Sequence, residues 1–252
     1  MGKNRIYPWV IFSLVVIFIN VLLVYLSIRL PDHTPVWKGR EIANEYGCFN
    51  CHGFEGQKGI KNPNYKYDEV PSWQGETAMM FISDENDIKE WILYGKPKRL
   101  EKIDHGGLIK MPAYEKVISE KELKNLTIYL KAVMGLIQID DEKAKIGFEI
   151  AKKNGCFGCH GPYGMGGMPN PKSLKGYIPG WDGFDFAKLV KNDNELKEWI
   201  ENGTIERLKK NKLARKFTDA QIVKMPAFKD VLTPEEIEAI SHYIKWLREQ
   251  KF

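Results

Sequence analysis

The sequence predicts an all-α protein in which an N-terminal transmembrane helix is followed by two similar domains in tandem. Three observations predict it: a long apolar segment near the N-terminus, an internal repeat over most of the remaining chain, and helix-capping signals without the alternating apolar pattern of strands. The 252 residues suffice for two small domains, and 43% hydrophobic with 28% charged residues is an ordinary globular composition. The net charge of +5 is too small to indicate nucleic-acid binding.

Residues 9–28 form the predicted transmembrane anchor. They contain no charged residue, and at about 1.5 Å rise per residue a helix of this length crosses the hydrocarbon core of a bilayer. The apolar segment is longer than that of a signal peptide and no Ala-x-Ala pattern follows it, so an uncleaved single-pass anchor is favoured over a cleaved signal or a buried core helix. Lys3 and Arg5 precede it, which places residues 1–8 in the cytoplasm and everything from the linker at 29–36 onward outside.

The rest of the chain contains an internal repeat. An offset of 108 residues, which carries Cys48 onto Cys156, superimposes glycines, cysteines, histidines and tryptophans of one half on identical residues of the other. Toward the C-terminus the offset becomes 114, so the second half has a six-residue insertion between Gly203 and Met225. Two copies indicate a duplicated globular domain, because a solenoid needs about three repeats or more. The predicted domains are residues 37–136 and 137–252.

Each domain is predicted to be mostly helical. The leading and middle segments of each domain end before a glycine, the residue type that commonly closes a helix in the left-handed conformation. The final helices open with capping boxes that start at Ser119 and Thr233. Loops rich in glycine and proline separate these segments without a strand pattern, so no sheet is expected. The expected leading and middle helices span residues 37–46, 85–94, 141–154 and 194–202.

All four cysteines lie in two Cys-x-x-Cys-His runs. This pattern attaches haem covalently: two thiols form thioether bonds to the haem vinyl groups, and the adjacent histidine is the proximal iron ligand. A redox dithiol would need a βαβ setting, and zinc would need a second pair of ligands beside each run or both pairs acting together. Two covalently bound haems c are therefore expected. The predicted attachment residues are Cys48, Cys51, Cys156 and Cys159, and the predicted proximal ligands are His52 and His160.

Two methionines are predicted to be the second axial ligands. Met111 and Met225 each precede Pro-Ala and an aromatic residue, shortly before the last helix of their domain. A thioether stabilises ferrous iron and raises the reduction potential, whereas core packing, the commoner role of methionine, does not explain the repetition. Pro63 and Pro171 follow the two histidines by eleven residues, where a loop carbonyl is predicted to accept the imidazole N–H; a turn proline is the alternative. His105, close to Met111, is interpreted as a surface residue.

Each domain resembles a class I c-type cytochrome. The resemblance rests on the Cys-x-x-Cys-His-Gly run, the proline loop, the Met-Pro-Ala turn, the leading helix with Gly39 or Gly147, and the final helix with Tyr129 or Tyr243. It implies two tandem class I cytochrome c domains in which the first and last helices cross near this glycine and this aromatic residue, burying the haem with one edge exposed. The first domain departs from the family pattern at Arg40, where an aromatic residue is usual.

The resemblance implies electron transfer rather than enzymatic turnover, because histidine and methionine would leave no iron position for a substrate. Dihaem subunits of quinol-oxidising cytochrome bc complexes, of cbb3-type terminal oxidases and of membrane nitrate reductases have a similar architecture. The expected partners are therefore integral-membrane respiratory subunits, or the protein carries electrons between such complexes. The alternative is a dihaem redox enzyme such as a peroxidase or a thiosulfate dehydrogenase, which would need one open iron position.

The expected location is the bacterial cytoplasmic membrane, with the haem domains on the periplasmic side. The insertion in the second domain is rich in lysine and arginine, and is interpreted as a solvated surface that would steer an acidic redox partner if it borders the exposed haem edge.

Overall fold

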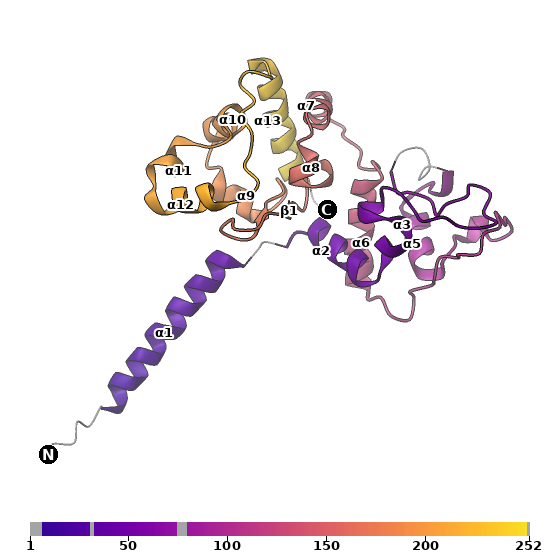
Figure 1. Cartoon of the computed structure of the whole chain (residues 1–252), viewed down its shortest axis with the longest axis horizontal. Helices are drawn as coiled ribbons and strands as arrows, with labels where there is room; N and C mark the ends of the chain where they lie inside the picture. The colour runs from indigo at the N-terminus through magenta and orange to yellow at the C-terminus, as the bar shows by residue number, and fades with distance from the viewer. Residues whose placement is uncertain (1–6, 31–32, 75–79, 251–252) are drawn as a thin grey trace.

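The apolar N-terminal segment forms α1 (Pro8–Arg29), which projects away from the rest of the molecule (Figure 1). The computed structural model describes residues 7–30, 33–74 and 80–250; within them α1 alone is long and apolar enough to cross a membrane, and the domains bury none of Pro8–Ser27. A bilayer suits such a helix, because its backbone hydrogen bonds are all internal. Residues 1–6, with Lys3 and Arg5, and residues 31–32 of the predicted linker lie outside the described residues.

Helices dominate both of the remaining units, so the predicted fold class is confirmed. The capping boxes at Ser119 and Thr233 are both present, with each hydroxyl accepting a backbone N–H and each partner carboxylate accepting one in return. The first unit contains α2 (Pro35–Glu45), α3 (Cys48–His52), η1 (Phe54–Gly56), α5 (Glu85–Tyr94), η2 (Lys98–Leu100) and α6 (Glu120–Val133). The second contains α7 (Glu142–Lys153), α8 (Phe157–His160), η3 (Pro162–Gly164), α9 (Phe184–Leu189), α10 (Asp193–Asn202), α11 (Glu206–Lys210), α12 (Lys212–Ala220) and α13 (Pro234–Glu249).

One short sheet departs from the expectation of none. Strands β1 (Met168–Pro169) and β2 (Tyr177–Ile178) pair antiparallel and close the loop that follows α8. Two residues per strand are too few to produce an alternating pattern, which is why the sequence does not indicate them.

The first and last helices of each domain cross at a glycine, as the family resemblance implies. A Cβ atom added to Gly39 on α2 would lie 2.2 Å from the Asn125 carbonyl oxygen on α6. The same addition to Gly147 on α7 would lie 2.0 Å from the Ala239 carbonyl oxygen on α13. Only glycine therefore permits these backbones to approach so closely. The repeated tyrosines Tyr129 and Tyr243, both 0% exposed, pack at the two crossings.

The two domains are in contact through the start of the first and a loop of the second. The Trp37 ring on α2 meets the Tyr177 ring edge-on, with 5.0 Å between centroids, and a Cβ on Gly166 would touch the Trp37 backbone. The same loop reaches the anchor, because the Lys175 ammonium donates a 2.7 Å hydrogen bond to the Leu30 carbonyl oxygen. The second domain is thus joined both to the first domain and to the end of α1.

Candidate functional site

Each domain encloses one large, mainly apolar cavity, of about 250 Å³ in the first domain and about 330 Å³ in the second. The cavities lie between the helix that carries the Cys-x-x-Cys-His run and the loop that carries the predicted methionine. All eight residues predicted as attachment points or axial ligands lie on their walls. The first cavity is lined by Cys48, Cys51, His52 and Met111, and the second by Cys156, Cys159, His160 and Met225.

The two histidines are held in one orientation by backbone carbonyls. The His52 Nδ1 atom lies 2.8 Å from the Pro71 carbonyl oxygen, and the His160 Nδ1 atom lies 3.0 Å from that of Pro179. A carbonyl can only accept, so Nδ1 carries the proton and Nε2 keeps its lone pair for a ligand. Burial lowers the pKa of both imidazoles and outweighs the opposing effect of the carbonyls, which keeps them neutral at physiological pH.

These carbonyls are not those of Pro63 and Pro171, so that prediction was wrong about the acceptor. The Pro63 carbonyl oxygen instead accepts the Leu108 N–H at 2.9 Å, and the Pro171 carbonyl oxygen accepts the Ile222 N–H at 3.3 Å. The loop after each histidine first runs out to the methionine-bearing loop and then turns back toward the histidine. The acceptor therefore lies on the returning half of the loop, at Pro71 and Pro179.

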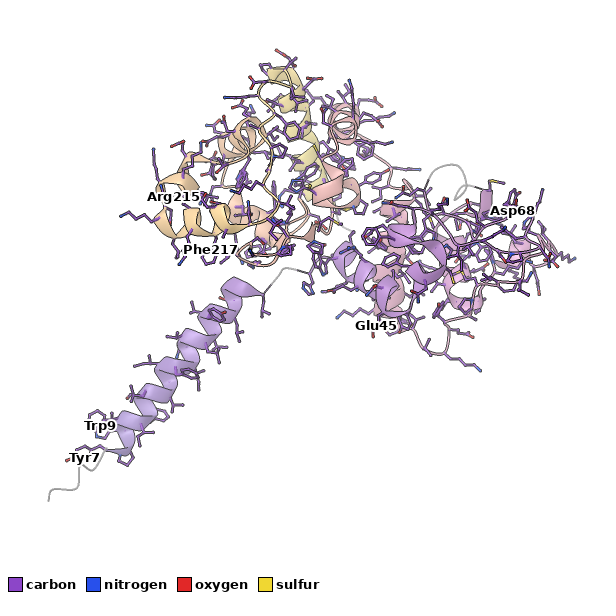
Figure 2. All side chains as sticks on the ribbon, in the orientation of Figure 1. Tyr7, Trp9, Glu45, Asp68, Arg215 and Phe217 are labelled. Carbon is purple, nitrogen blue, oxygen red and sulfur yellow. The ribbon has the colours of Figure 1, made fainter. Side chains whose placement is uncertain are left out.

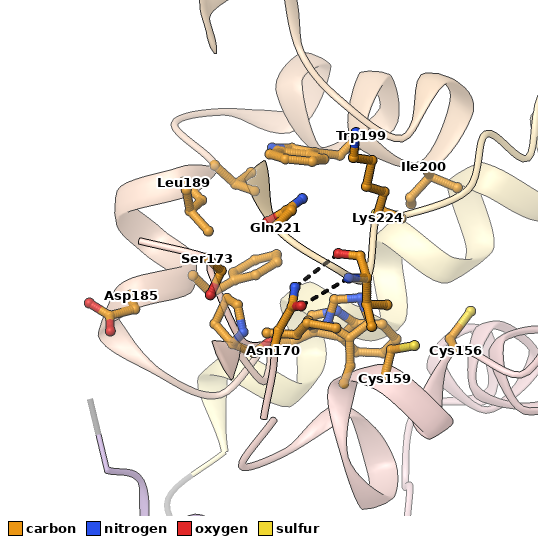
Figure 3. Close-up of a pocket in the computed structure, with 18 of the residues that line it drawn as sticks. Cys156, Cys159, Asn170, Ser173, Asp185, Leu189, Trp199, Ile200, Gln221 and Lys224 are labelled. Atoms are coloured by element: carbon orange, nitrogen blue, oxygen red, sulfur yellow. Dashed lines mark hydrogen bonds between the residues drawn. The ribbon is translucent and has the colours of Figure 1, made fainter. Parts of the chain in front are cut away.

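Two buried asparagines hold the methionine loops in place, and sequence reasoning missed them. The Asn62 amide donates to the Ile109 carbonyl oxygen at 3.0 Å and accepts the Ile109 N–H at 2.8 Å. The Asn170 amide makes the same pair of bonds to Val223, both at 2.9 Å (Figure 3). Ile109 and Val223 each lie two residues before the methionine. The available signal was the identical Asn-Pro pair in both halves of the chain.

An aromatic cluster packs beside each histidine ring. Trp73 lies 5.0 Å from His52 and 5.7 Å from Phe49 between ring centroids. Trp181 lies 5.1 Å from His160 and forms the matching contacts in the second domain. Large rigid rings on this side of the cavity fix the imidazole and exclude water from it.

The thiols do not have the properties of a redox dithiol. Burial raises the pKa of Cys48 and of Cys156 to about 11, whereas reactive thiols have a depressed pKa. The two Cys-x-x-Cys-His runs also open onto different cavities, so they cannot form one joint four-ligand zinc site. Protonated thiols on the wall of a large apolar cavity suit covalent attachment of a large apolar group.

An unpaired donor on the second cavity supports the fit to haem. The Trp199 Nε1–H is buried and has no hydrogen-bond partner among the described residues, whereas its counterpart Trp91 donates to the Phe81 carbonyl oxygen at 3.2 Å. A buried unpaired N–H costs about 1–3 kcal/mol, so an occupant with an acceptor is favoured there. Trp199, Gln221 and Lys224 together line this cavity (Figure 3). A flat macrocycle that carries carboxylates would fill such a cavity, and it would supply the acceptor that the Trp199 N–H lacks.

His105 is not the surface residue that the sequence suggested. It is half-buried, lines the first cavity, and packs against Phe81 with 5.7 Å between ring centroids. The loop that carries it folds back through an antiparallel bridge between Tyr65 and Gly106. Its sequence position gave no sign of this, because the second domain has no matching histidine.

Comparisons with protein families agree with this geometry. The family model described as cytochrome c matches residues 144–248, and the model described as subunit III of cbb3-type cytochrome c oxidase matches residues 35–130. Both domains belong to the class I c-type cytochrome family. Such cytochrome domains carry covalently bound haem c and transfer electrons.

A curated relative is the cbb3-type cytochrome c oxidase subunit FixP of Azorhizobium caulinodans, 26% identical over 210 residues. The match covers 82% of this cytochrome but only 58% of FixP, so the chain spans less than two thirds of that relative. Among solved structures, a chain of the reducing HAO-like protein complex of Kuenenia stuttgartiensis matches 83% of this chain and 95% of its own length. Its identity is 17% and its TM-score 0.28, too low for any structural argument.

Proposed function

We propose that this cytochrome is a membrane-anchored dihaem electron-transfer subunit of a respiratory oxidase of the cbb3 type. The observation that carries the proposal is the repeated cavity with two thiols, one oriented imidazole and one methionine on its walls. The match of residues 35–130 to the cbb3 subunit III model and the likeness to FixP favour this complex over quinol-oxidising bc complexes and nitrate reductases.

In this proposal the chain binds one haem c in each domain. Cys48 and Cys51 would attach the first haem, and His52 and Met111 would hold its iron. Cys156 and Cys159 would attach the second haem, and His160 and Met225 would hold its iron. The asparagines Asn62 and Asn170 position the methionine loops, and Pro71 and Pro179 orient the imidazoles.

The residues around each cavity account for a one-electron carrier. The bound iron supplies the ferric–ferrous couple. A neutral imidazole and a neutral thioether add no charge to the buried site, and the soft sulfur favours the ferrous state, which raises the reduction potential. Trp73 and Trp181 keep water away from the imidazoles. With His and Met as axial ligands, neither domain retains a position for substrate.

The anchor places both domains beside integral-membrane partners. In this proposal α1 crosses the bacterial cytoplasmic membrane once, with residues 1–8 in the cytoplasm, residues 29–36 as the linker, and domains 37–136 and 137–252 on the periplasmic side. A tethered carrier suits a fixed position within a complex better than free diffusion between complexes.

Copurification tests the partner. The affinity-tagged full-length protein is extracted from its native membrane in mild detergent, and the proteins retained with it are identified. We expect the catalytic subunit of a haem–copper oxidase at a stoichiometric ratio. Retention of a cytochrome bc complex or of a nitrate reductase in its place would assign the protein to another complex.

Carbon monoxide tests the class of function. The reduced holoprotein should bind carbon monoxide only slowly and at far below one equivalent, because in this proposal Met111 and Met225 would each hold the iron of their domain. Rapid stoichiometric binding at one haem would indicate the open position that a peroxidase or another dihaem enzyme needs, and would contradict the carrier function.

A further inference from the structure

The segment of the second domain that contains the six-residue insertion is strongly basic. Residues 206–220 include six lysines and arginines but only two acidic residues, in a chain whose total charge is +5. They form α11, which takes the place of η2 in the first domain, and α12. The corresponding segment of the first domain, residues 96–110, is also basic, and α12 adds further cations on the surface of the second domain. Such cations attract an anionic partner.

Only part of this charge is used within the domain. Arg207 forms an ion pair with Glu195 at 2.7 Å, and Lys209 forms one with Glu206 at 3.2 Å. The remaining four cations are exposed, and no acidic side chain in the described ranges lies within ion-pair distance of them. They are Lys210 at the end of α11 and Lys212, Arg215 and Lys216 on α12, called here the basic face.

The inner and outer sides of this helix pair differ in character. Leu208 on α11 and Phe217 on α12 line the second cavity and help to close it. Leu213, which follows Lys212 on α12, is 67% exposed. A short cationic helix with an exposed leucine has the composition of a segment that lies in the interface of a membrane.

The anchor brings the basic face to a membrane surface. Along the axis of α1, α12 lies at the level at which α1 ends, whereas the first domain lies farther from the anchor (Figure 1). In this view Arg215 and Phe217 lie at the level of this end of α1, and Trp9 marks the opposite end (Figure 2). The bond from Lys175 to the Leu30 carbonyl ties the same domain to the residue that follows α1. A bilayer spanned by α1 would therefore have its surface at the level of α12.

We propose that α12 rests on anionic phospholipid headgroups at the membrane surface, with its basic face against the lipid phosphates and Leu213 in the interface. Attraction of cations to an anionic surface extends only over about a Debye length, so it acts where the anchor already holds the helix. The contact would fix the orientation of the second domain and keep its cavity close to the bilayer. This inference does not depend on which complex the protein serves.

Hydrogen exchange of the full-length holoprotein in nanodiscs tests the contact. Amide exchange over residues 206–220 is compared in discs of phosphatidylcholine alone and in discs that contain about one third phosphatidylglycerol. We expect roughly tenfold slower exchange in the anionic discs, and loss of the difference at high salt. A variant with Lys210, Lys212, Arg215 and Lys216 all changed to Gln should lose it too, and Leu213→Ser should reduce it.

The matched control removes four exposed lysines from the first domain, by changing Lys58, Lys116, Lys121 and Lys124 to Gln. It loses the same charge and should keep the slow exchange. Equal exchange of the wild-type segment in both kinds of disc would overturn the proposal. So would slowing that ignores lipid and appears only when the purified oxidase complex is added, because the basic face would then bind an acidic protein. Unchanged absorption spectra establish that each variant retains its haem sites.

Discussion

Arg40 and Glu55 occupy in the first domain the places of two aromatic rings that are in contact in the second. The Arg40 guanidinium pairs with the Glu55 carboxylate, which also accepts a 2.5 Å hydrogen bond from the Tyr129 hydroxyl. At the matching positions, the Phe148 ring packs against the Tyr163 ring, tilted by 36° with 4.6 Å between centroids. The departure at Arg40 that the sequence showed is thus half of a paired exchange, in which a buried ion pair replaces a ring contact.

The first prediction concerns this exchange. Arg40→Phe alone should destabilise the protein by about 3–5 kcal/mol, because Glu55, only 9% exposed, would be left charged and unpaired. Adding Glu55→Tyr should recover most of the loss by recreating the ring pair of the second domain. Urea unfolding of both variants measures their free energies of unfolding. If the second substitution added a further loss instead of recovering the first, the pairing would be contradicted.

A second prediction concerns Asn62. Asn62→Ala removes both hydrogen bonds to Ile109, which should loosen the loop that holds Met111. The free energy that holds this loop in place should fall by about 1–3 kcal/mol. Carbon monoxide binding to the reduced protein should then rise at one haem. Asn86→Ala, at an exposed position on α5, is the control and should leave binding unchanged. No rise in the Asn62 variant would mean that the loop is held by other contacts.

At the scale of elements, the crossing of the first and last helices is the feature shared by both domains. It depends on one glycine per domain, since any side chain there would enter the facing backbone. Gly39→Ala should therefore lower the free energy of unfolding by about 3 kcal/mol or more, measured as a lower unfolding midpoint. Gly158→Ala is the matched control, because a Cβ there meets no atom within 4 Å. Similar losses for the two variants would argue against a tight crossing.

The middle helix of each domain is fixed to the following turn by an ion pair. Glu195 on α10 pairs with Arg207, and Asp87 on α5 pairs with Arg99 at 2.7 Å. Arg99 and Arg207 therefore serve the fold of their own domains and are not free to steer a partner.

The fourth prediction follows from the pKa of Glu195, which the hydrogen bonds from Arg207 lower to about 2. The folded state thus has the lower pKa, so the pair stabilises it above the ordinary value near 4.5 and loses this effect as pH falls toward 2. Glu195→Gln should lower the free energy of unfolding by only about 1 kcal/mol at neutral pH, because solvent screens this surface pair. Near pH 2 the substitution should have almost no effect. Stability measured against pH checks it. A loss that persists at low pH would show a role in packing instead.

At the scale of the whole molecule, the two domains meet through Trp37. Its ring stacks on His33 with 5.6 Å between centroids and meets Tyr177 of the second domain edge-on. Trp37 is 9% exposed although it lies at the start of a short helix, because the second domain covers it. A buried ring shared by two domains couples their unfolding.

Trp37→Ala should accordingly separate one thermal transition into two and lower the first midpoint. The free energy of unfolding should fall by about 3 kcal/mol. Scanning calorimetry of the holoprotein in detergent measures it. Tyr94→Ala, which removes an exposed ring from the first domain, should leave the transitions together. If wild type already shows two transitions, the contact at Trp37 does not couple the domains.

Much of this protein is determined locally, and its sequence alone predicted that part. The apolar run, the two Cys-x-x-Cys-His motifs, the capping boxes and the Met-Pro-Ala turns each depend on neighbours a few residues apart, and repetition in both halves distinguished them from chance. The helices α5, α6 and α13 follow the predicted segments for this reason, and the crossings at Gly39 and Gly147 agree with the family resemblance.

Only the tertiary structure decided which distant groups meet. The carbonyl that orients His52 comes from a residue 19 positions away, and the amide that holds the methionine loop acts across 47 positions. Both contacts pass through glycine- and proline-rich loops, where no periodic pattern shows where the chain turns back. The partner of Arg40 and the level of α12 along the axis of α1 were hidden for the same physical reason. They are set by long-range packing, which leaves no regular spacing in the sequence.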